Sequence, residues 1–284
     1  MRALIFGCGY LGSKVATIWQ SLDYHVSVVT RNKKNAERFR SLGYQPLIAD
    51  ITDLESLKNI PTDFDVVLFS VGFDRTRYAD IRHVYVDGLK NVLERLKTAQ
   101  SHWVYISSTG VFGDCKGQWI DESTPAQPLR PGGQACLEAE QLVRASQNPF
   151  TILRLAGIYG PGRIPRLQAI KDRAWSELGQ SRRINLIHVA DAAAIVAAVV
   201  EQKVLDQTFL VSDGQPADRK LFYEFVADQA GTGPINWNVD SEVEGSRRSA
   251  ADKKVSNSKL VEQTGYQFQF PDFRAGIIDS ISKD

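Results

Sequence analysis

The chain has 284 residues, of which 43% are hydrophobic and 24% charged, and its formal net charge is +1. These values are typical of a soluble globular protein with one large core, and they argue against nucleic acid or an anionic membrane as partner. The N-terminus lacks a secretion signal, the apolar stretches are too short to span a bilayer, and the three scattered cysteines form no metal-binding pair. We therefore expect a reduced, cytoplasmic protein without a metal site.

Strands and helices alternate through the first half of the chain, where short apolar runs predict strands and amphipathic or charged runs predict helices. In order, we expect a strand at 3–6, a helix at 11–22, a strand at 25–30, a helix at 33–42, strands at 45–50 and 65–72, a helix at 77–98, a strand at 102–110, a helix at 134–146 and a strand at 150–160. This alternation predicts an α/β fold, a doubly wound parallel sheet with helices on both faces.

The pattern loosens after Gly160. Here we expect a helix at 166–178, a strand at 183–189, a helix at 190–202, a strand at 207–213, a helix at 217–230, a polar surface loop at 241–254 and two short helices around a proline turn. The interpretation is a doubly wound domain over 1–160, its sheet completed by the strands near 183–189 and 207–213. Residues 161–284 then form mainly a smaller C-terminal lobe.

The sequence GCGYLG at 7–12 fits the glycine fingerprint of dinucleotide-binding domains. In that motif Gly7 turns the chain sharply, Gly9 lets a pyrophosphate approach the backbone, and Gly12 allows close packing of helix on strand. The fingerprint lies between an apolar strand and an amphipathic helix, whose N-terminus would face the phosphates. The alternative is a tight turn that needs glycines for packing alone.

The end of the second strand distinguishes the two nicotinamide cofactors. It reads VVTRNKKN, so Arg31 stands where NAD-binding proteins place an acidic residue for the ribose hydroxyls. A guanidinium suits a 2′-phosphate, which favours NADP over NAD, although Arg31 could also belong to a solvated loop. Asp50, at the end of the third strand, could reach the adenine amino group or cap the next helix.

With these features in place, the chain resembles the short-chain dehydrogenase/reductase superfamily, in its extended epimerase/dehydratase branch. The resemblance covers nearly the whole chain and rests on GCGYLG (7–12), VYVDGLKNVL (84–93), YISSTGVFG (105–113), DEST (121–124), LRLAGIYGPGR (153–163) and NLIHVADAA (185–193). It implies the Rossmann fold, a bound dinucleotide and a C-terminal substrate lobe. The implied cofactor contacts are Gly7, Gly9, Tyr10, Leu11, Gly12, Arg31, Asp50, Ile51, Ser70, Val71 and Gly72.

The resemblance also implies that Ser108 hydrogen-bonds a substrate hydroxyl or carbonyl, with Ser107, Thr109 and Tyr159 as substrate contacts. The alternative for the serines is that small hydroxyl groups only satisfy backbone groups at a strand end. The family's base is a tyrosine followed four residues later by a lysine. Aligning the family on LEAE (137–140) puts Gly132 at the tyrosine position and Cys136 at the lysine position, and no Tyr or Lys occurs between Trp119 and Arg154.

Two hypotheses remain. In the first, the protein acts on a small-molecule substrate, such as a nucleotide-sugar or a related carbonyl or hydroxyl compound, with a replacement acid/base: Tyr78, Tyr159, Cys136, Asp121 or Glu122. In the second, it binds NADP as a regulatory or scaffold protein without efficient turnover. A substrate diphosphate could meet the basic residues Arg163, Arg182, Arg183, Arg247 and Arg248. A homodimer could form through the helices near 77–98 and 134–146.

Overall fold

The structure is a computed structural model that describes residues 1–173, 183–237 and 251–283. Two compact units interleave along the chain. The first comprises Met1–Val111, Ala126–Arg154 and Ala193–Phe209, and the second Phe112–Pro125, Leu155–Ala192 and Leu210–Asp284. Each unit is therefore made of three chain segments, and the chain passes between the units several times.

A seven-stranded sheet forms the centre of the first unit, in the order β11-β7-β5-β4-β1-β2-β3. Its strands are β1 (Arg2–Phe6), β2 (His25–Thr30), β3 (Gln45–Ile48), β4 (Val66–Phe69), β5 (His102–Ser108), β7 (Phe150–Leu155) and β11 (Gln207–Val211). The neighbouring pairs from β5 to β3 are parallel. Strand order reverses between β1 and β4, the usual ligand position in such sheets, and the doubly wound fold is confirmed.

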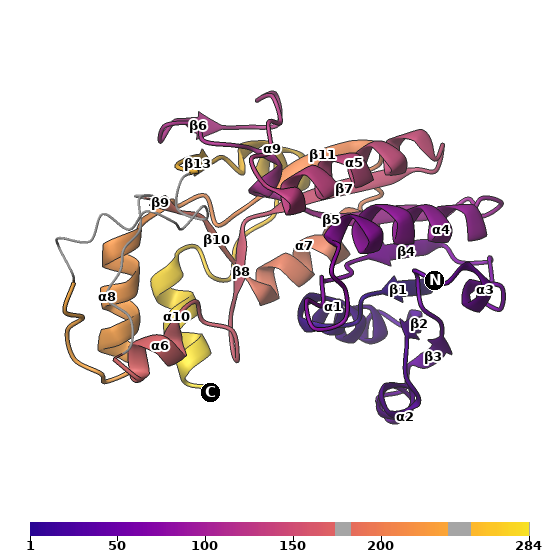
Figure 1. Cartoon of the computed structure of the whole chain (residues 1–284), viewed down its shortest axis with the longest axis horizontal. Helices are drawn as coiled ribbons and strands as arrows, with labels where there is room; N and C mark the ends of the chain where they lie inside the picture. The colour runs from indigo at the N-terminus through magenta and orange to yellow at the C-terminus, as the bar shows by residue number, and fades with distance from the viewer. Residues whose placement is uncertain (174–182, 238–250, 284) are drawn as a thin grey trace. The chain divides into compact units, whose positions relative to one another are not determined.

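The helices that lie between these strands along the chain are α1 (Tyr10–Ser21), α2 (Lys33–Ser41), α3 (Leu54–Leu57), α4 (Gly88–Arg95), α5 (Pro131–Ala145) and α7 (Val189–Glu201). A π-helical turn, η1 (His83–Asp87), leads into α4, and a 3₁₀ turn, η2 (Thr109–Val111), follows β5. Helices α4 and α5 lie side by side (Figure 1). The helix expected at 77–98 begins only at residue 81. Asp74 holds the preceding residues in a turn by accepting hydrogen bonds from the amide and hydroxyl of Thr76.

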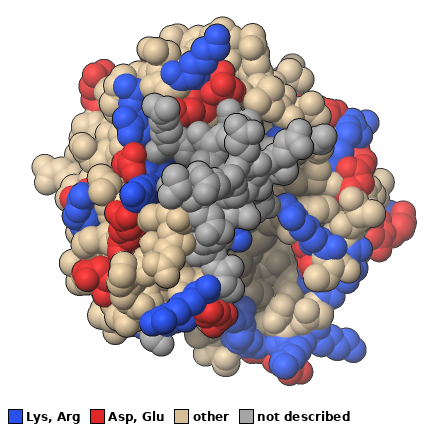
Figure 2. Space-filling model, turned by 60° about the vertical axis from the view of Figure 1, so that its left-hand side comes forward, with Lys and Arg blue, Asp and Glu red and all other residues tan. Residues whose placement is uncertain are grey.

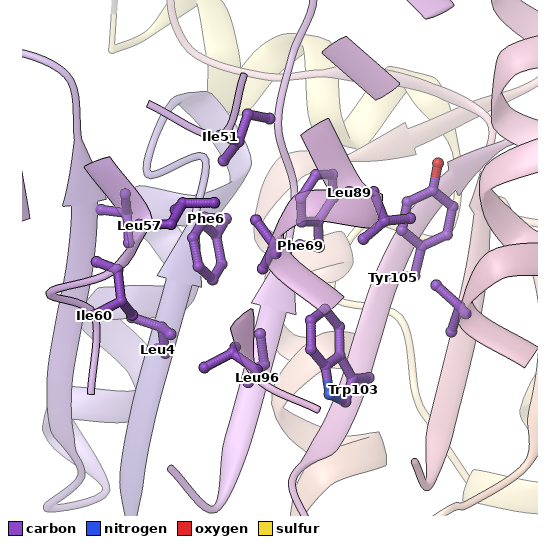
Figure 3. Packing of buried hydrophobic residues seen from close by; sticks show 14 of the residues in the cluster. Leu4, Phe6, Ile51, Leu57, Ile60, Phe69, Leu89, Leu96, Trp103 and Tyr105 are labelled. Atoms are coloured by element: carbon purple, nitrogen blue, oxygen red, sulfur yellow. The ribbon is translucent and has the colours of Figure 1, made fainter. Parts of the chain in front are cut away.

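Aromatic rings near the carboxyl ends of the strands fix the central part of the sheet. The Phe6 and Phe69 ring centres lie 6.1 Å apart, and those of Phe69 and Tyr105 lie 6.0 Å apart. These three side chains are at most 2% exposed, and Figure 3 shows them toward one end of the cluster, with Leu4 and Trp103 toward the other. Burying each ring contributes roughly 2–3 kcal/mol, so this row holds the strand ends in register.

The second unit is built from two-stranded pairings and short helices. The strands are β6 (Trp119–Ile120), β8 (Gly157–Tyr159), β9 (Arg183–Ile184), β10 (Leu186–His188), β12 (Ala217–Asp218) and β13 (Lys254–Val255). The pairs are β8 with β10, β9 with β12, and β6 with β13. The helices are α6 (Leu167–Lys171), α8 (Arg219–Gln229), α9 (Ser258–Thr264) and α10 (Phe273–Ile281). Helices α6, α8 and α10 share a core to which Tyr159, Phe222 and Phe273 belong.

The strand expected at 183–189 does not join the central sheet. It splits into β9 and β10, which pair with β12 and β8, so only β11 of the two expected strands completes the seven. The backbone turns away after Leu155, and the Gly157 amide donates to the Asn185 carbonyl oxygen across the new pairing. Part of the helix expected at 166–178 and of the loop expected at 241–254 lies outside the described residues.

Candidate functional site

The glycine-rich turn after β1 has two tightly packed glycines and one that faces open space. A Cβ added at Gly7, whose φ is +92°, would lie 2.4 Å from the Ser70 carbonyl oxygen. One added at Gly12 would lie 2.3 Å from the Gly7 carbonyl oxygen, whereas a Cβ at Gly9 would meet no atom within 4 Å. Gly7 and Gly12 are thus required for packing of the protein itself. Packing does not explain Gly9, which leaves room for a ligand beside the start of α1.

A cavity of about 310 Å³ opens beside this turn, at the carboxyl ends of β1 to β4. Its walls are Phe6, Gly7, Cys8, Gly9, Val29, Thr30, Arg31, Asn35, Arg38, Phe39, Ala49, Asp50, Ile51, Val71, Gly72, Tyr78 and Val84. Of the residues expected to contact a cofactor, Gly7, Gly9, Arg31, Asp50, Ile51, Val71 and Gly72 are brought together here. Tyr10, Leu11, Gly12 and Ser70 are not in the wall. The Ser70 hydroxyl instead donates to the Gly7 carbonyl oxygen at 3.0 Å, which fixes the turn.

Two guanidinium groups belong to the wall at the end of β2. Arg31 donates to the Tyr78 hydroxyl at 3.2 Å and to Asp74 at 3.4 Å, and about two fifths of its side chain is exposed. Arg38, on α2, lies over the Phe39 ring with 4.9 Å to the ring centre. The sequence reasoning missed Arg38 and Asn35. They lie three residues apart on α2 and therefore share one face of that helix, which could have identified them together.

Asp50 is held in a network of its own. Its carboxylate accepts hydrogen bonds from the Thr52 amide at 3.0 Å, the Tyr78 hydroxyl at 2.9 Å and Arg77 at 2.9 Å. Burial alone would raise the Asp50 pKa, but these hydrogen bonds and the Arg77 charge outweigh it, and the pKa is lowered. The alternative that Asp50 caps the next helix is wrong, because the side chain that caps α3 belongs to Asp53.

The hydroxyl groups at the end of β5 differ in their surroundings. Ser107 is buried and donates to Glu140 Oε1 at 2.6 Å. Glu140, 1% exposed, also binds Arg154 through two hydrogen bonds of 2.9 and 2.7 Å. Ser107 therefore ties β5 to α5 and β7. Thr109 is buried in η2. The Ser108 hydroxyl accepts a hydrogen bond from the Gly110 amide at 3.0 Å, and Ser108 is the only one of the three residues that is partly exposed.

Helix α5 carries neither tyrosine nor lysine. Its start approaches η2 so closely that a Cβ at Gly133 would lie 2.2 Å from the Gly110 carbonyl oxygen, whereas one at Gly132 would only touch Ile81 at 3.4 Å. Burial, followed by the nearby Glu140 carboxylate, raises the Cys136 pKa to about 12. This raised pKa favours the protonated thiol, which argues against Cys136 as a base.

The other proposed acid/base residues are buried, bound to backbone amides or part of the cavity wall. Tyr159 is fully buried, and burial followed by the Asp213 charge raises its pKa far above the ordinary value. The Asp121 carboxylate accepts bonds from the Ser123 and Thr124 amides and closes a turn. Glu122 accepts from the Leu210 amide at 2.7 Å. Tyr78 belongs to the cavity wall and binds Asp50, so it lies on the expected adenosine side and not beside Ser108.

Charged side chains of both signs share the described surface. On the face drawn in Figure 2, Lys and Arg side chains alternate with Asp and Glu. Of the five arginines considered for a diphosphate, Arg182, Arg247 and Arg248 lie outside the described residues, and Arg183 pairs with Asp218 at 3.6 Å. Within residues 1–173, 183–237 and 251–283, the acidic, His and Cys side chains form no group of three that could hold a metal ion. No helix in those ranges is both long and apolar enough to cross a bilayer.

Comparison with known proteins places the chain in a family. The model of the NAD-dependent epimerase/dehydratase family matches residues 3–211. Protein YeeZ of Escherichia coli K12 is 26% identical over 285 residues, covering 95% of this chain and 97% of YeeZ. A Methylobacillus flagellatus structure, put forward as an NAD-dependent epimerase/dehydratase, is 28% identical with a TM-score of 0.78, over 99% of this chain and 97% of that one.

A UDP-glucuronic acid 4-epimerase from Bacillus cereus, solved with UDP-glucuronic acid and NAD, shares the fold. Its TM-score is 0.82 at 18% identity, over 100% of this chain and 98% of that one. The matched segment takes in the glycine turn, the cavity and the seven strands of the central sheet. The chain belongs to the NAD-dependent epimerase/dehydratase family.

Proposed function

We propose that the protein binds NADP in the cavity at the carboxyl ends of β1 to β4. The observation that carries this proposal is the combination of Gly9, which faces open space, with two guanidinium groups in the same wall. The residues present fit a dinucleotide. Gly9 leaves a cradle that a larger side chain would fill, and among the described residues no side-chain hydrogen bond caps the start of α1.

The 2′-phosphate of NADP would be held by Arg31 and Arg38, with Asn35 between them on α2. Arg31 now pairs with Asp74 at 3.4 Å across an exposed surface, and such pairs contribute less than about 1 kcal/mol. A phosphate can therefore displace Asp74 at small cost and gain charge-assisted hydrogen bonds from the guanidinium. Among the residues that line the cavity, only Asp50 is acidic, and it already accepts bonds from Thr52, Tyr78 and Arg77. NAD, the alternative cofactor, has no 2′-phosphate for these two guanidinium groups to bind.

The reaction we propose is hydride chemistry at a carbonyl or hydroxyl group of a small molecule. The bound nicotinamide supplies or accepts the hydride. Ser108 would hydrogen-bond the substrate oxygen, because its hydroxyl is partly exposed at the end of β5, whereas Ser107 is buried against Glu140. A nucleotide-sugar or a related carbonyl compound is the proposed substrate class, by analogy with the epimerase that binds UDP-glucuronic acid.

The alternative is that the protein binds NADP without efficient turnover, as a regulator or scaffold. The absence of tyrosine and lysine from α5 favours it. The two hypotheses share the cofactor and differ only in chemistry, so binding and turnover must be measured on the same preparation.

The test is a titration with NADPH and NADH, followed by incubation with UDP-sugars and small diketones and by product analysis. Product analysis is necessary because an epimerase returns its hydride and causes no net oxidation of NADPH. Tight NADPH binding with a converted product supports the enzyme, and tight binding without any product supports the regulator. Failure to bind either nucleotide would overturn both.

We also propose that the protein forms a homodimer through α4 and α5. These two helices pack side by side and so offer one continuous two-helix surface. Light scattering coupled to size-exclusion chromatography would give twice the chain mass for the dimer, and the mass of one chain would contradict it.

A further inference from the structure

The π-helical turn η1 contributes Val84 to the wall of the cofactor cavity. It spans His83–Asp87 and runs directly into α4. π-Helical turns are rare, and they occur frequently at functional sites. Val84 lines the cavity, and a Cβ at Gly88 would lie 2.7 Å from the end of the Ile51 side chain. The turn therefore passes closely over the cavity, and Tyr85 follows a cavity residue directly.

The Tyr85 ring lies between the loop after β4 and helix α5. It meets the Phe73 ring edge to face, with ring centres 6.4 Å apart and an interplanar angle of 83°. Phe73 follows Val71 and Gly72, which are both in the cavity wall. Helix α5 packs against η1, and the Cys136 thiol lies near enough to affect the Tyr85 phenol electrostatically. The phenol is thus close to the position where the sequence alignment placed the missing lysine.

Two other tyrosines of this unit are less suited to proton transfer. Tyr105 is 2% exposed, and its hydroxyl interacts with the Cys136 thiol. In Figure 3 that hydroxyl lies at the end of a ring packed among core residues. Tyr78 donates to Asp50. Tyr85 differs from Tyr105 in being partly exposed.

We propose that Tyr85 replaces the missing phenol of α5 and donates a proton to the substrate carbonyl oxygen during reduction. This inference rests on the proposed function, because NADPH is the source of the hydride. As the carbonyl carbon gains the hydride, the Tyr85 O–H bond breaks and its proton forms the O–H bond of the product alcohol. The phenolate then takes a proton from water. The sum is carbonyl compound, NADPH and one proton giving alcohol and NADP⁺.

The surroundings of Tyr85 keep its phenol protonated. Burial and the Cys136 thiol raise its pKa, and the hydrogen bond from the Phe73 amide offsets this only in part. A phenol whose pKa lies above the ordinary value of about 10 stays protonated throughout the neutral range. Tyr85 is therefore in the protonated state from which it can give a proton to a developing alkoxide.

The first experiment locates the phenol without using activity. Protein labelled with ¹³C at tyrosine Cζ gives one signal for each of its nine tyrosines, and Tyr85→Phe and Tyr78→Phe assign the two of interest. The probes are NADP⁺ and 2′,5′-ADP, which lacks the nicotinamide half. We expect the Tyr85 signal to move with NADP⁺ alone and the Tyr78 signal to move with both. A Tyr85 signal that stays fixed while that of Tyr78 moves would overturn the inference. Binding of neither probe would overturn the proposed function itself.

The second experiment tests the proton transfer. With 2,3-butanedione as the carbonyl probe, Tyr85→Phe should keep its NADPH Kd within about twofold and lower kcat at least roughly 100-fold, the usual contribution of a general acid. Tyr105→Phe, which also removes a single phenolic hydroxyl near Cys136, should change kcat less than about threefold. Equal rates for wild type and Tyr85→Phe, or no reduction by wild type, would overturn the acid role. Thermal unfolding checks that both variants fold.

Discussion

Replacing Gly9 by valine separates a ligand-binding glycine from the packing glycines beside it. Gly9 has φ of −93°, outside the left-handed region, and a Cβ added there meets no atom within 4 Å, so the side chain begins in open space. The loss of a favourable residue at the start of α1 costs about 1 kcal/mol of folding stability. A bound pyrophosphate, by contrast, would have to occupy the same space as the valine side chain.

The expected loss of cofactor binding follows from that overlap. Forcing a branched side chain into a filled space costs about 2–3 kcal/mol, which corresponds to a roughly 30- to 150-fold weaker Kd. NADPH fluorescence titration measures the Kd, and chemical denaturation measures stability. The matched control is Gly12→Ala, whose Cβ would lie 2.3 Å from the Gly7 carbonyl oxygen and should reduce stability by about 1–3 kcal/mol. If Gly9→Val binds NADPH within about threefold of wild type, the glycine turn is only a structural element.

Three further variants test other parts of the account. Arg38→Ala should weaken NADPH binding roughly 10- to 100-fold and leave NADH binding unchanged, because only the 2′-phosphate hydrogen-bonds this guanidinium. Glu140→Gln removes the buried ion pair between Glu140 and Arg154 and should reduce the free energy of unfolding by about 3–5 kcal/mol, measured by urea denaturation. Burial raises the Asp213 pKa from 3.8 to about 7, so the folded state binds the proton more tightly than the unfolded state. The contribution of Asp213 to folding stability should therefore be complete below pH 4 and be lost, by as much as about 4 kcal/mol, as pH rises to 7, and Asp213→Asn should remove this part of the pH dependence.

Each of these variants has a defined contrary result. Equal weakening of NADPH and NADH by Arg38→Ala would mean that the guanidinium supports the fold and not the phosphate. For Glu140 the control is Glu138→Gln on the same helix, where the pair with Arg82 is about half exposed and contributes less than about 1 kcal/mol. Equal losses from the two glutamates would contradict the buried-pair interpretation. If wild type and Asp213→Asn respond alike to pH between 4 and 7, the Asp213 carboxyl is ionised throughout that range.

The sequence was most informative where function depends on local backbone geometry. The spacing of Gly7, Gly9 and Gly12 predicted a strand, a sharp turn and a helix, and all three are present. The sequence also predicted that Arg31 and Asp50 lie at one site, since strand ends in a parallel sheet meet at one edge, and both residues are in the cavity wall. The absence of tyrosine and lysine from α5 could also be read directly from the sequence, because it concerns residue types and not their arrangement.

Features built from distant segments escaped prediction. The two-residue strand β6 joins the second unit by pairing with β13, more than 130 residues along the chain, and two residues carry too little periodicity to reveal it. Tyr85 lies in a run that predicts an ordinary helix, and a π-helical turn has no distinctive sequence pattern. Its neighbours Phe73 and Cys136 come from two other segments, so its setting emerges only in the folded chain.

The most direct test of the central claim is the ratio of the NADH and NADPH dissociation constants, measured by titration on wild type and on Arg31→Asp. We predict that wild type binds NADPH at least tenfold more tightly than NADH, because only NADPH places a phosphate between Arg31 and Arg38. Arg31→Asp should bring the ratio to one or below, since a carboxylate repels the phosphate and accepts bonds from ribose hydroxyls. A wild-type ratio near one, unchanged by the substitution, would contradict the NADP assignment.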